Sequence, residues 1–307
     1  MKKVLIATEK PFAKAAVEGI KKILSDAGIE AVLLEKYTDA NELLQKVSDV
    51  EGLIVRSDKV TREVVEAAKN LKIVVRAGAG YDNLDLAACT EHKVTAMNTP
   101  GQNSNAVAEL AIALMVYMAR NTFAPGTGSE LKGKTLGIHA YGNVGRLVAL
   151  LGKGFGMQVY AFDPFVSKEK IEQDGVKVCQ TIAQLYSTCQ YVSLHIPATE
   201  QTKKSINADL LKQMPQGGTL INTARKEVID EDSVLALLQE RTDLRYAADV
   251  APACHAAAKE KLGTRYFATE KKMGAETAEA NINAGLAAAQ QVVNFLQKGD
   301  KTFQVNK

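Results

Sequence analysis

Two glycines and an aspartate in the middle of the chain have the types and spacing of a turn that binds phosphate and ribose. Gly142 and Gly145 lie in the turn 140–145, and Asp163 follows roughly twenty residues later. Glycine lets a backbone approach a pyrophosphate closely, and an acidic side chain at this spacing can bind adenosine ribose hydroxyls. The pattern predicts a dinucleotide site, and Asp163 favours NAD because it would repel a 2′-phosphate. The structural alternative is a strand–helix turn without a ligand.

The segments around this turn are those that a dinucleotide site needs. Residues 135–139 and 158–162 are apolar runs typical of buried parallel strands, and residues 144–155 carry apolar side chains at helical spacing. The N-terminus of that helix would face the pyrophosphate. The cofactor contacts expected in the turn are Tyr141, Gly142, Asn143, Val144 and Gly145.

Further short apolar runs predict strands on both sides of this unit. They lie at residues 4–7, 31–34, 52–55, 73–75, 94–97, 191–194, 219–221 and 245–248, with amphipathic segments between most of the early ones. This rhythm predicts an α/β chain with two Rossmann- or flavodoxin-like parallel-sheet domains and a cleft between them. We expect a substrate-binding domain at residues 1–98 plus 283–307 and an NAD-binding domain at 99–282. A long helix predicted at 275–297 would return the chain to the first domain.

Arginines follow several of the predicted strands, where ligands gather in such folds. Arg56 and Ser57 follow one strand, and the glycine-rich stretch 76–83 follows the next. An arginine with a serine could hold a phosphate, and a glycine-rich turn could present N–H groups to a carboxylate. Solvated turns are the plainer interpretation. Arg225 follows a strand of the nucleotide domain, where a guanidinium could clamp a carboxylate and polarise a carbonyl.

Hydride transfer would also need a base for the hydroxyl proton, and the four histidines are weak candidates. His139 lies inside a predicted strand and is expected in the core, whereas His92 is expected on the surface. His195 follows a strand near the cofactor, and His255 has no distinctive position. We expect His195, Pro197 and Thr223 to contact the cofactor, because they follow strands of the nucleotide domain.

Composition bounds the remaining possibilities. The 307 residues suffice for two ordinary domains, and a formal net charge of +3 is too small to argue for nucleic acid. Four dispersed cysteines without ligand spacing predict reduced thiols and no metal site. We expect a cytoplasmic chain, since no stretch has the length of a membrane span or of a signal peptide's apolar region. The helix predicted at 105–120 is apolar almost all round, so we expect it to be buried between domains or against a partner, and it predicts a homodimer.

Seven stretches together resemble the D-2-hydroxyacid dehydrogenase family, and within it the phosphoglycerate dehydrogenases. The resemblance covers nearly the full length and is highly specific. The stretches are VRSDKV (55–60), RAGAGYDNLDL (76–86), NTPGQNSNAVAEL (98–110), AYGNVGR (140–146), SLHIPATEQT (193–202), LINTARKEVIDE (220–231) and AADV (247–250).

The resemblance implies roles for individual residues. Arg225 resembles the catalytic, substrate-binding arginine, and Asp163 and Asp249 match cofactor contacts. The remaining matches concern the substrate: Arg56 and Ser57 resemble contacts to a substrate phosphate, Ala77 and Gly78 resemble backbone donors to a substrate carboxylate, and Asn103 falls in a signature beside the active site.

Three departures from the family pattern stand out. Ala140 replaces the first glycine of the fingerprint, and Lys226 follows the arginine where glycine is usual. The family's catalytic glutamate and histidine are both absent, and Lys272 occupies the place of the histidine. A lysine needs a lowered pKa to accept a proton near neutral pH, which a neighbouring carboxylate would oppose. In having a lysine in place of the histidine, the chain resembles a subgroup of short phosphoglycerate dehydrogenases that lack regulatory domains.

The expected activity is therefore NAD-dependent oxidation of a small anionic 2-hydroxy acid, with 3-phospho-D-glycerate as the leading substrate and serine biosynthesis as the setting. Lys272 would take the C2 hydroxyl proton while Arg225 holds the carboxylate; Lys271 or His255 are the other candidate bases. A glyoxylate or hydroxypyruvate reductase is the alternative within the family. A non-catalytic NAD-binding scaffold is the alternative outside it, favoured by the missing glutamate and histidine.

Overall fold

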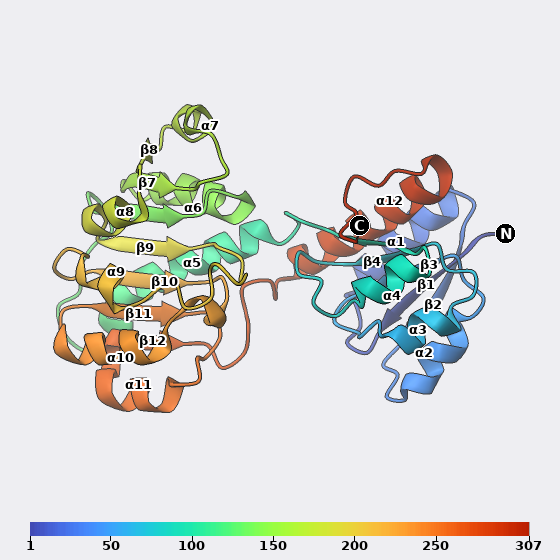
Figure 1. Cartoon of the computed structure of the whole chain (residues 1–307), viewed down its shortest axis with the longest axis horizontal. Helices are drawn as coiled ribbons and strands as arrows, with labels where there is room; N and C mark the ends of the chain where they lie inside the picture. Colours follow the sequence, from blue (N-terminus) through green and yellow to red (C-terminus); the bar gives the residue numbers. More distant parts are fainter. Residues whose placement is uncertain (307) are drawn as a thin grey trace. The chain divides into compact units, whose positions relative to one another are not determined.

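The computed structural model describes residues 1–306, which divide into two compact units (Figure 1). Unit 1 comprises Met1–Asn103 and the chain from Thr277 onward, and unit 2 comprises Ser104–Glu276. Both divisions fall where a long helix begins, since α5 starts at Ser104 and Thr277 caps α12. They lie a few residues from the predicted boundaries at 98/99 and 282/283.

Unit 1 is one five-stranded parallel sheet with helices on both faces, in the order β2-β1-β3-β4-β5. This is the flavodoxin-like order, in which the chain reverses direction across the sheet between β1 and β3. Its elements are β1 (Lys3–Thr8), α1 (Lys14–Asp26), β2 (Glu30–Glu35), α2 (Ala40–Val47), β3 (Gly52–Val55), α3 (Arg62–Ala67), β4 (Ile73–Arg76), α4 (Leu86–Glu91), β5 (Thr95–Asn98) and α12 (Ala278–Lys298).

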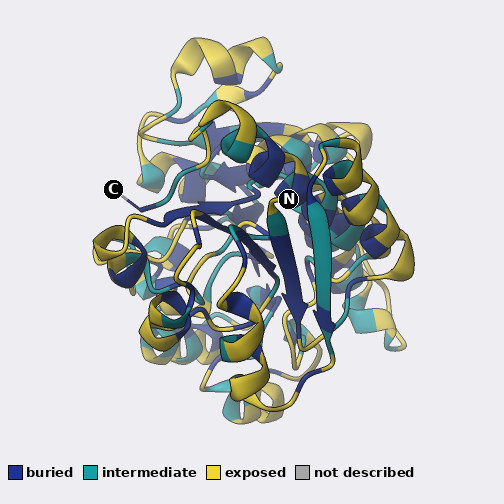
Figure 2. Cartoon of the chain, turned by 90° about the vertical axis from the view of Figure 1, so that its right-hand side faces the viewer, coloured by how far each residue is buried: buried dark blue, intermediate teal, exposed yellow. Residues whose placement is uncertain are grey.

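The alternation of side chains along β1 explains the two faces of this unit. Val4 and Ile6 pack with α1 and α12, which lie side by side, whereas Leu5 and Ala7 pack with α2, α3 and α4. Both faces are covered, so the central strands are apolar throughout rather than alternating. In Figure 2 the strands are mostly dark blue and the outer surfaces of the helices yellow. The predicted return of the chain through a C-terminal helix is confirmed within this unit.

Unit 2 is a seven-stranded parallel sheet in the order β12-β11-β10-β9-β6-β7-β8. The strand order reverses between β6 and β9, the position where doubly wound sheets bind ligands. Its elements are α5 (Ser104–Ala119), β6 (Thr135–His139), α6 (Asn143–Gly154), β7 (Gln158–Phe162), α7 (Lys168–Gln173), β8 (Lys177–Val178), α8 (Ile182–Thr188), β9 (Tyr191–Leu194), α9 (Ala208–Lys212), β10 (Thr219–Asn222), α10 (Glu231–Glu240), β11 (Arg245–Ala248), α11 (His255–Leu262) and β12 (Tyr266–Ala268), with short 3-10 turns at Asn121–Phe123, Lys226–Val228 and Gly263–Arg265.

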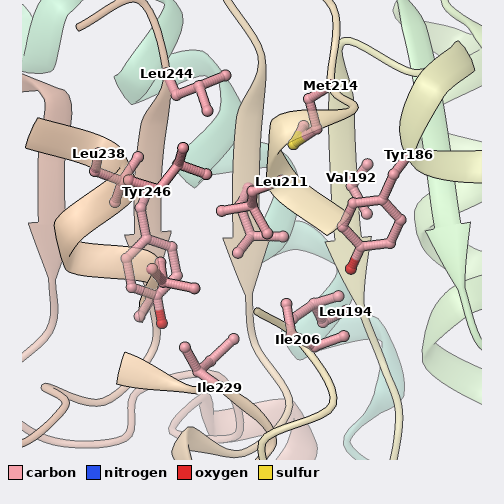
Figure 3. Close-up of a cluster of buried hydrophobic side chains, with 14 of the residues drawn as sticks. Tyr186, Val192, Leu194, Ile206, Leu211, Met214, Ile229, Leu238, Leu244 and Tyr246 are labelled. Atoms are coloured by element: carbon pink, nitrogen blue, oxygen red, sulfur yellow. The ribbon is translucent and has the colours of Figure 1, made fainter. Parts of the chain in front are cut away.

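Two hydrophobic clusters cover the faces of this sheet. One joins the strands to α8, α9, α10 and α11, and Figure 3 shows part of it, including Tyr186, Leu211, Leu238 and Tyr246. The other joins them to α5, α6 and α7. Ten residues of α5 are buried, and it packs against α6 and against β10 and β11. Its own unit therefore explains the apolar composition of α5, and the homodimer stays a prediction with less support.

His139 lies in β6 and is buried, as its place in a predicted strand indicated. Burial lowers its pKa from 6.5 to about 4, with the charge of Asp163 opposing the shift. The folded chain thus keeps His139 neutral at a pH where the unfolded chain is protonated. This residue's contribution to stability is present above pH 6.5 and declines as the pH falls toward 4.

We therefore expect the free energy of unfolding to fall by about 2 kcal/mol between neutral pH and pH 5 on account of His139. Urea titrations at both pH values will measure the fall, and His139→Gln should reduce it. The matched control is His92→Gln, which changes an exposed histidine and should leave the difference intact. An equal fall in the His139→Gln variant would contradict the assignment.

The turn after β6 contains a strained alanine. Ala140, in place of the first glycine of the fingerprint, has φ +78°, a left-handed conformation that L-residues other than glycine, asparagine and aspartate rarely adopt. Its N–H donates to the Phe162 carbonyl at 3.0 Å, which holds the turn to the end of β7. The turn therefore holds Ala140 in a strained conformation.

Ala140→Gly should raise the free energy of unfolding by about 1 kcal/mol, because glycine adopts this conformation without steric cost. Chemical denaturation of the two proteins tests this. Ala256→Gly is the matched control: Ala256 is exposed within α11, where glycine should instead destabilise by up to about 1 kcal/mol. The idea fails if both substitutions shift stability in the same direction.

Candidate active site

The turn between β6 and α6 leaves room at the start of the helix. A Cβ added to Gly142 would meet no atom within 4 Å, whereas one on Gly145 would lie 2.2 Å from the Ala140 carbonyl oxygen. Gly145 is thus required by the close packing of the helix on its own turn, but Gly142 is not. Within residues 1–306 no side chain caps α6. Its first N–H groups and the open space at Gly142 fit a pyrophosphate.

Asp163 follows β7 and holds this turn through its carboxylate. Its Oδ2 accepts the Tyr141 N–H at 2.7 Å, and its Oδ1 accepts the N–H groups of Phe165 and Val166 at 2.8 and 3.2 Å. A carboxylate offers about four acceptor positions, so capacity for a ribose hydroxyl remains. The Tyr141 side chain is buried and donates to Asp174, so the cofactor contact predicted at Tyr141 would require its N–H to change or share its partner Asp163. Asn143 and Val144 form the first turn of α6.

Three buried polar atoms at the β9 and β10 strands have no hydrogen-bond partner within the described chain. They are Ser193 Oγ, His195 Nε2 and Thr223 Oγ1. An unpaired buried polar group is costly, so such atoms fit a bound polar group, as expected for His195 and Thr223. Burial lowers the pKa of His195 to about 3, helped by the neighbouring His139. His195 is therefore a poor proton acceptor at neutral pH. Pro197 lies in the exposed loop beyond it.

Asn222 shapes the turn that carries Arg225. Its Oδ1 accepts the Ala224 N–H at 3.0 Å and its Nδ2 donates to the Arg225 carbonyl at 2.9 Å. The Arg225 guanidinium donates from Nη1 to the Ala224 carbonyl at 3.0 Å, and the residue is half-buried. Asn222 ends β10, and its carbonyl also accepts the Asp249 N–H at 2.8 Å. The Arg225 turn is therefore linked directly to the end of β11.

Asp249, predicted to contact the cofactor, is buried and bonded to the loop that carries Lys272. Its Oδ1 accepts the Thr269 hydroxyl at 2.9 Å and the Met273 N–H at 2.7 Å, and its Oδ2 accepts the Gly274 N–H at 2.8 Å. Lys272 immediately precedes two of these donors and is exposed. Within unit 2, hydrogen bonds through Asn222 and Asp249 thus connect the segments of Arg225 and Lys272.

In unit 1, Arg56 follows β3 and is half-buried. Its Nη1 donates to the Lys10 and Pro11 carbonyls at 3.2 and 3.0 Å, and its Nη2 donates to Asn281 Oδ1 at 2.6 Å. Asn281 lies in the first turn of α12, so this contact joins the two segments of the chain that make up unit 1. Ser57 is exposed beside Arg56. These contacts fix the guanidinium at the carboxyl edge of the sheet, where the predicted phosphate would bind.

Asp58 organises the backbone around Arg56. It is buried and accepts the Glu9 N–H and the Tyr37 hydroxyl at Oδ1, both at 2.7 Å, and the Arg56 N–H at Oδ2 at 3.3 Å. Burial is the main cause of the raised pKa of Tyr37, and the hydrogen bond to Asp58 adds to it. Sequence reasoning missed Asp58 and Asn281. Asp58 lay within the stretch 55–60 that carried the resemblance, whereas nothing in the sequence linked Asn281 to Arg56.

The glycine-rich stretch after β4 is tightly folded on itself. Ala77 donates its N–H to the Val55 carbonyl at 2.8 Å, and Gly78 donates to the Arg76 carbonyl at 2.9 Å. Gly78 has φ +154°, which would strain another residue, and a Cβ there would lie 1.4 Å from Arg76 Nη1 and so displace the Arg76 guanidinium. The predicted carboxylate contacts at Ala77 and Gly78 would require these N–H groups to change or share partners. Asn103 precedes α5 and is half-buried.

No group of three metal-ligating side chains gathers among residues 1–306. No helix in the same range is long and apolar enough to cross a membrane. Cys89, Cys179, Cys189 and Cys254 are all free thiols, and the first three are buried. Burial raises the pKa of Cys254 to about 11, helped by the charge of Glu231, which disfavours the reactive thiolate.

Comparisons with known proteins agree with this geometry. The sequence profile "D-isomer specific 2-hydroxyacid dehydrogenase, NAD binding domain" matches residues 111–269, which contain the glycine turn, Asp163, Arg225 and Asp249. A crystal structure of NAD+-bound 3-phosphoglycerate dehydrogenase from Entamoeba histolytica is 47% identical. It covers 100% of this chain and 99% of its own, with a TM-score of 0.89.

Two curated relatives differ in length. The D-3-phosphoglycerate dehydrogenase of Methanocaldococcus jannaschii is 34% identical over 90% of this chain, but the match covers only 55% of that protein. The hydroxypyruvate reductase of Thermotoga maritima is also 34% identical, and the match covers 87% of this chain and 92% of the reductase. The chain spans about half the length of most curated phosphoglycerate dehydrogenases that it matches.

The profile match extends over more than half of the chain, and the similarity to the Entamoeba and Thermotoga proteins extends over nearly all of it. The strand order of unit 2 and the space at Gly142 fit the same assignment. The chain therefore belongs to the D-isomer specific 2-hydroxyacid dehydrogenase family, and residues 111–269 form its NAD-binding domain.

Proposed function

We propose that this chain oxidises 3-phospho-D-glycerate to 3-phosphohydroxypyruvate with NAD+ as the hydride acceptor, in serine biosynthesis. The observation that carries the proposal is the 47% identity over both full chains to the Entamoeba histolytica 3-phosphoglycerate dehydrogenase. The anchored Arg56 supports it, because a guanidinium fixed at a strand end suits a phosphorylated substrate. Cytoplasmic location and a homodimer are proposed from the sequence.

Arg225 and Lys272 carry the proposed chemistry in unit 2. The Arg225 guanidinium, placed by the Asn222 turn, would bind the substrate carboxylate and polarise the C2 oxygen. Lys272, in its neutral form, would accept the C2 hydroxyl proton at Nζ. Bound NAD+ would supply the acceptor for the C2 hydrogen and its electron pair, so the products would be the 2-oxo acid, NADH and the proton held at Lys272 Nζ. The remaining substrate contacts proposed in unit 1 are Ser57, Ala77, Gly78 and Asn103.

NADH formation from 3-phospho-D-glycerate at alkaline pH, beside D-glycerate and D-lactate, tests the proposal. Lys272→Ala should lower kcat about 10²- to 10⁴-fold, the usual contribution of a general base. Lys271→Ala is the matched control, since it removes the preceding exposed lysine and should leave turnover nearly unchanged. Near wild-type turnover in Lys272→Ala would contradict the assignment of Lys272 as the base, and Lys271 or His255 would then be the next candidates.

Arg56 separates the proposed substrate from those of a glyoxylate or hydroxypyruvate reductase, the alternative favoured by the match to the Thermotoga protein. Arg56→Ala should lower kcat/KM for 3-phospho-D-glycerate about 100-fold, the loss of a charge-assisted contact of roughly 3 kcal/mol, and spare unphosphorylated acids. Arg62→Ala, which breaks an exposed ion pair with Glu91, is the control. Equal losses on both kinds of substrate would contradict a phosphate contact.

The glycine turn allows the cofactor site to be tested without catalysis. Gly142→Ala should fold normally, because Gly142 has φ −80° and its added Cβ meets nothing. It should nevertheless weaken NADH binding at least about tenfold, or 1.4 kcal/mol, because the methyl group occupies the space left for the pyrophosphate. Fluorescence titration with NADH measures this, with circular dichroism to check the fold. Unchanged NADH affinity would place the pyrophosphate elsewhere.

A non-catalytic NAD-binding protein is the remaining alternative, since the family's glutamate and histidine are absent. On this alternative, the unaltered chain binds NADH but turns over no 2-hydroxy acid. Gly142→Ala would still weaken the binding of NADH. Turnover restricted to the phosphorylated acid would exclude it and establish the proposed function.

A further inference from the structure

The Asp249 carboxylate is used almost entirely within its own unit. It is 4% exposed and accepts three hydrogen bonds of 2.7 to 2.9 Å, from Thr269, Met273 and Gly274. All three donors come from the segment that follows β12. The two backbone donors are the residues immediately after Lys272, so the carboxylate fixes the peptide planes next to that lysine.

Two further features show that this contact is built into the surrounding backbone. A Cβ on Gly274 would lie 2.8 Å from Asp249 Oδ2, so the absence of a side chain permits the short contact. Val250, directly after Asp249, has φ +121°, a strained conformation for a β-branched residue. Its N–H donates to Thr269 Oγ1 at 2.9 Å, and the Thr269 hydroxyl donates in turn to Asp249.

We propose that Asp249 is a positioning residue for Lys272, acting through the backbone of the 269–274 loop. The inference rests on the proposed function, in which Lys272 is the base. Asp249 matched a cofactor contact by resemblance, and the structure assigns its carboxylate a second task inside the protein. It would keep the Cα atom of Lys272 at a fixed place relative to the Arg225 turn, to which Asp249 is joined through Asn222.

The chemistry of lysine explains why the backbone is the suitable point of control. A lysine ammonium sits on a flexible four-carbon stem, so its nitrogen is less precisely placed than a histidine ring. A carboxylate bound directly to that nitrogen would stabilise the ammonium and oppose its action as a base. A carboxylate bound to the neighbouring N–H groups restrains the loop through its backbone.

Asp249→Asn tests the proposal with little change in size. The asparagine keeps one acceptor oxygen and places an NH2 group where a second acceptor is needed, so at least one loop donor loses its partner. We expect kcat with 3-phospho-D-glycerate to fall roughly 10- to 100-fold, as misplacement of about 1 Å can cause. The substrate KM and the NADH dissociation constant should change less than about threefold. A loss of NADH affinity that accounts for the whole decrease would overturn the proposal in favour of a cofactor contact.

Gly274→Ala perturbs the same contact from the other side and introduces no charge change. Its methyl group must displace the loop from Asp249 Oδ2, so kcat should again fall more than KM rises. If both variants act through one contact, the double variant should lose no more activity than the more severely impaired of the two single variants. Multiplicative losses would show independent effects and overturn the proposal.

Hydrogen exchange measures the hydrogen bonds from Asp249 to the 269–274 loop, called the loop anchor below, without relying on activity. The amide protons of Met273 and Gly274 should exchange at least about tenfold faster in Asp249→Asn, while those in β9 and β10 stay protected. Asp243→Asn is the matched control. Asp243 lies just before β11 and accepts the Gly217 N–H, whereas Asp249 lies just after the same strand. It should affect neither the 273–274 amides nor kcat.

The outcomes separate this inference from the proposed function. Unchanged exchange at Met273 and Gly274 in Asp249→Asn would overturn the loop anchor, and faster exchange with undiminished kcat would overturn its role in positioning. A wild-type chain that binds NADH but turns over no 2-hydroxy acid would overturn the proposed function, and with it the positioning of a base. Faster exchange together with a selective fall in kcat supports the proposal.

Discussion

Parallel pairing is the constraint on which both units depend. Every strand in the two sheets runs parallel to its neighbours, so each connection within a sheet must cross over, and the carboxyl ends of each sheet's strands meet at one edge of that sheet. The β10–β11 register pairs Asn222 with Ala248, which brings the Arg225 turn next to Asp249 although 24 residues separate Arg225 from Asp249. The helices that cover the faces leave this edge to the loops. Chemistry is concentrated there because the topology delivers a loop from every strand to the same line.

Aspartates at this edge hold the loops that no helix covers. Asp58 lies shortly after β3, Asp163 follows β7 and Asp249 follows β11, and each accepts two or three backbone N–H groups from loops at its edge. A carboxylate suits this task because its charge strengthens each bond and its two oxygens can accept from different segments. Of the three, Asp163 keeps the greater access to solvent, in line with a role in ligand binding. The loops are thereby ordered by electrostatics where hydrophobic packing ends.

The sequence predicted the strands well because buried parallel strands are uninterrupted apolar runs. The bounds of β3, β6, β7, β9 and β11 agree with the expected ranges, but β8 and β12 contain only two and three residues, too few to show a pattern. The glycine turn and Asp163 were found from spacing alone. The hydrogen bond between Arg56 and Asn281 could not be predicted from the sequence. It joins positions that are 225 residues apart, and their pairing depends on the completed fold. The burial of α5 by its own unit was likewise invisible, since composition does not say which surface covers an apolar helix.

The return of α12 to unit 1 has a consequence for how the chain is made. Val4 and Ile6 on β1 pack with Ala288 and Val292 as well as with α1, so one face of the first sheet stays only partly covered until the ribosome has delivered α12. Unit 2 is continuous and can fold as soon as it emerges, whereas unit 1 must wait with an apolar surface exposed. The unit that begins synthesis first is therefore the one that completes its core last. During that interval the exposed apolar surface of unit 1 favours association between growing chains.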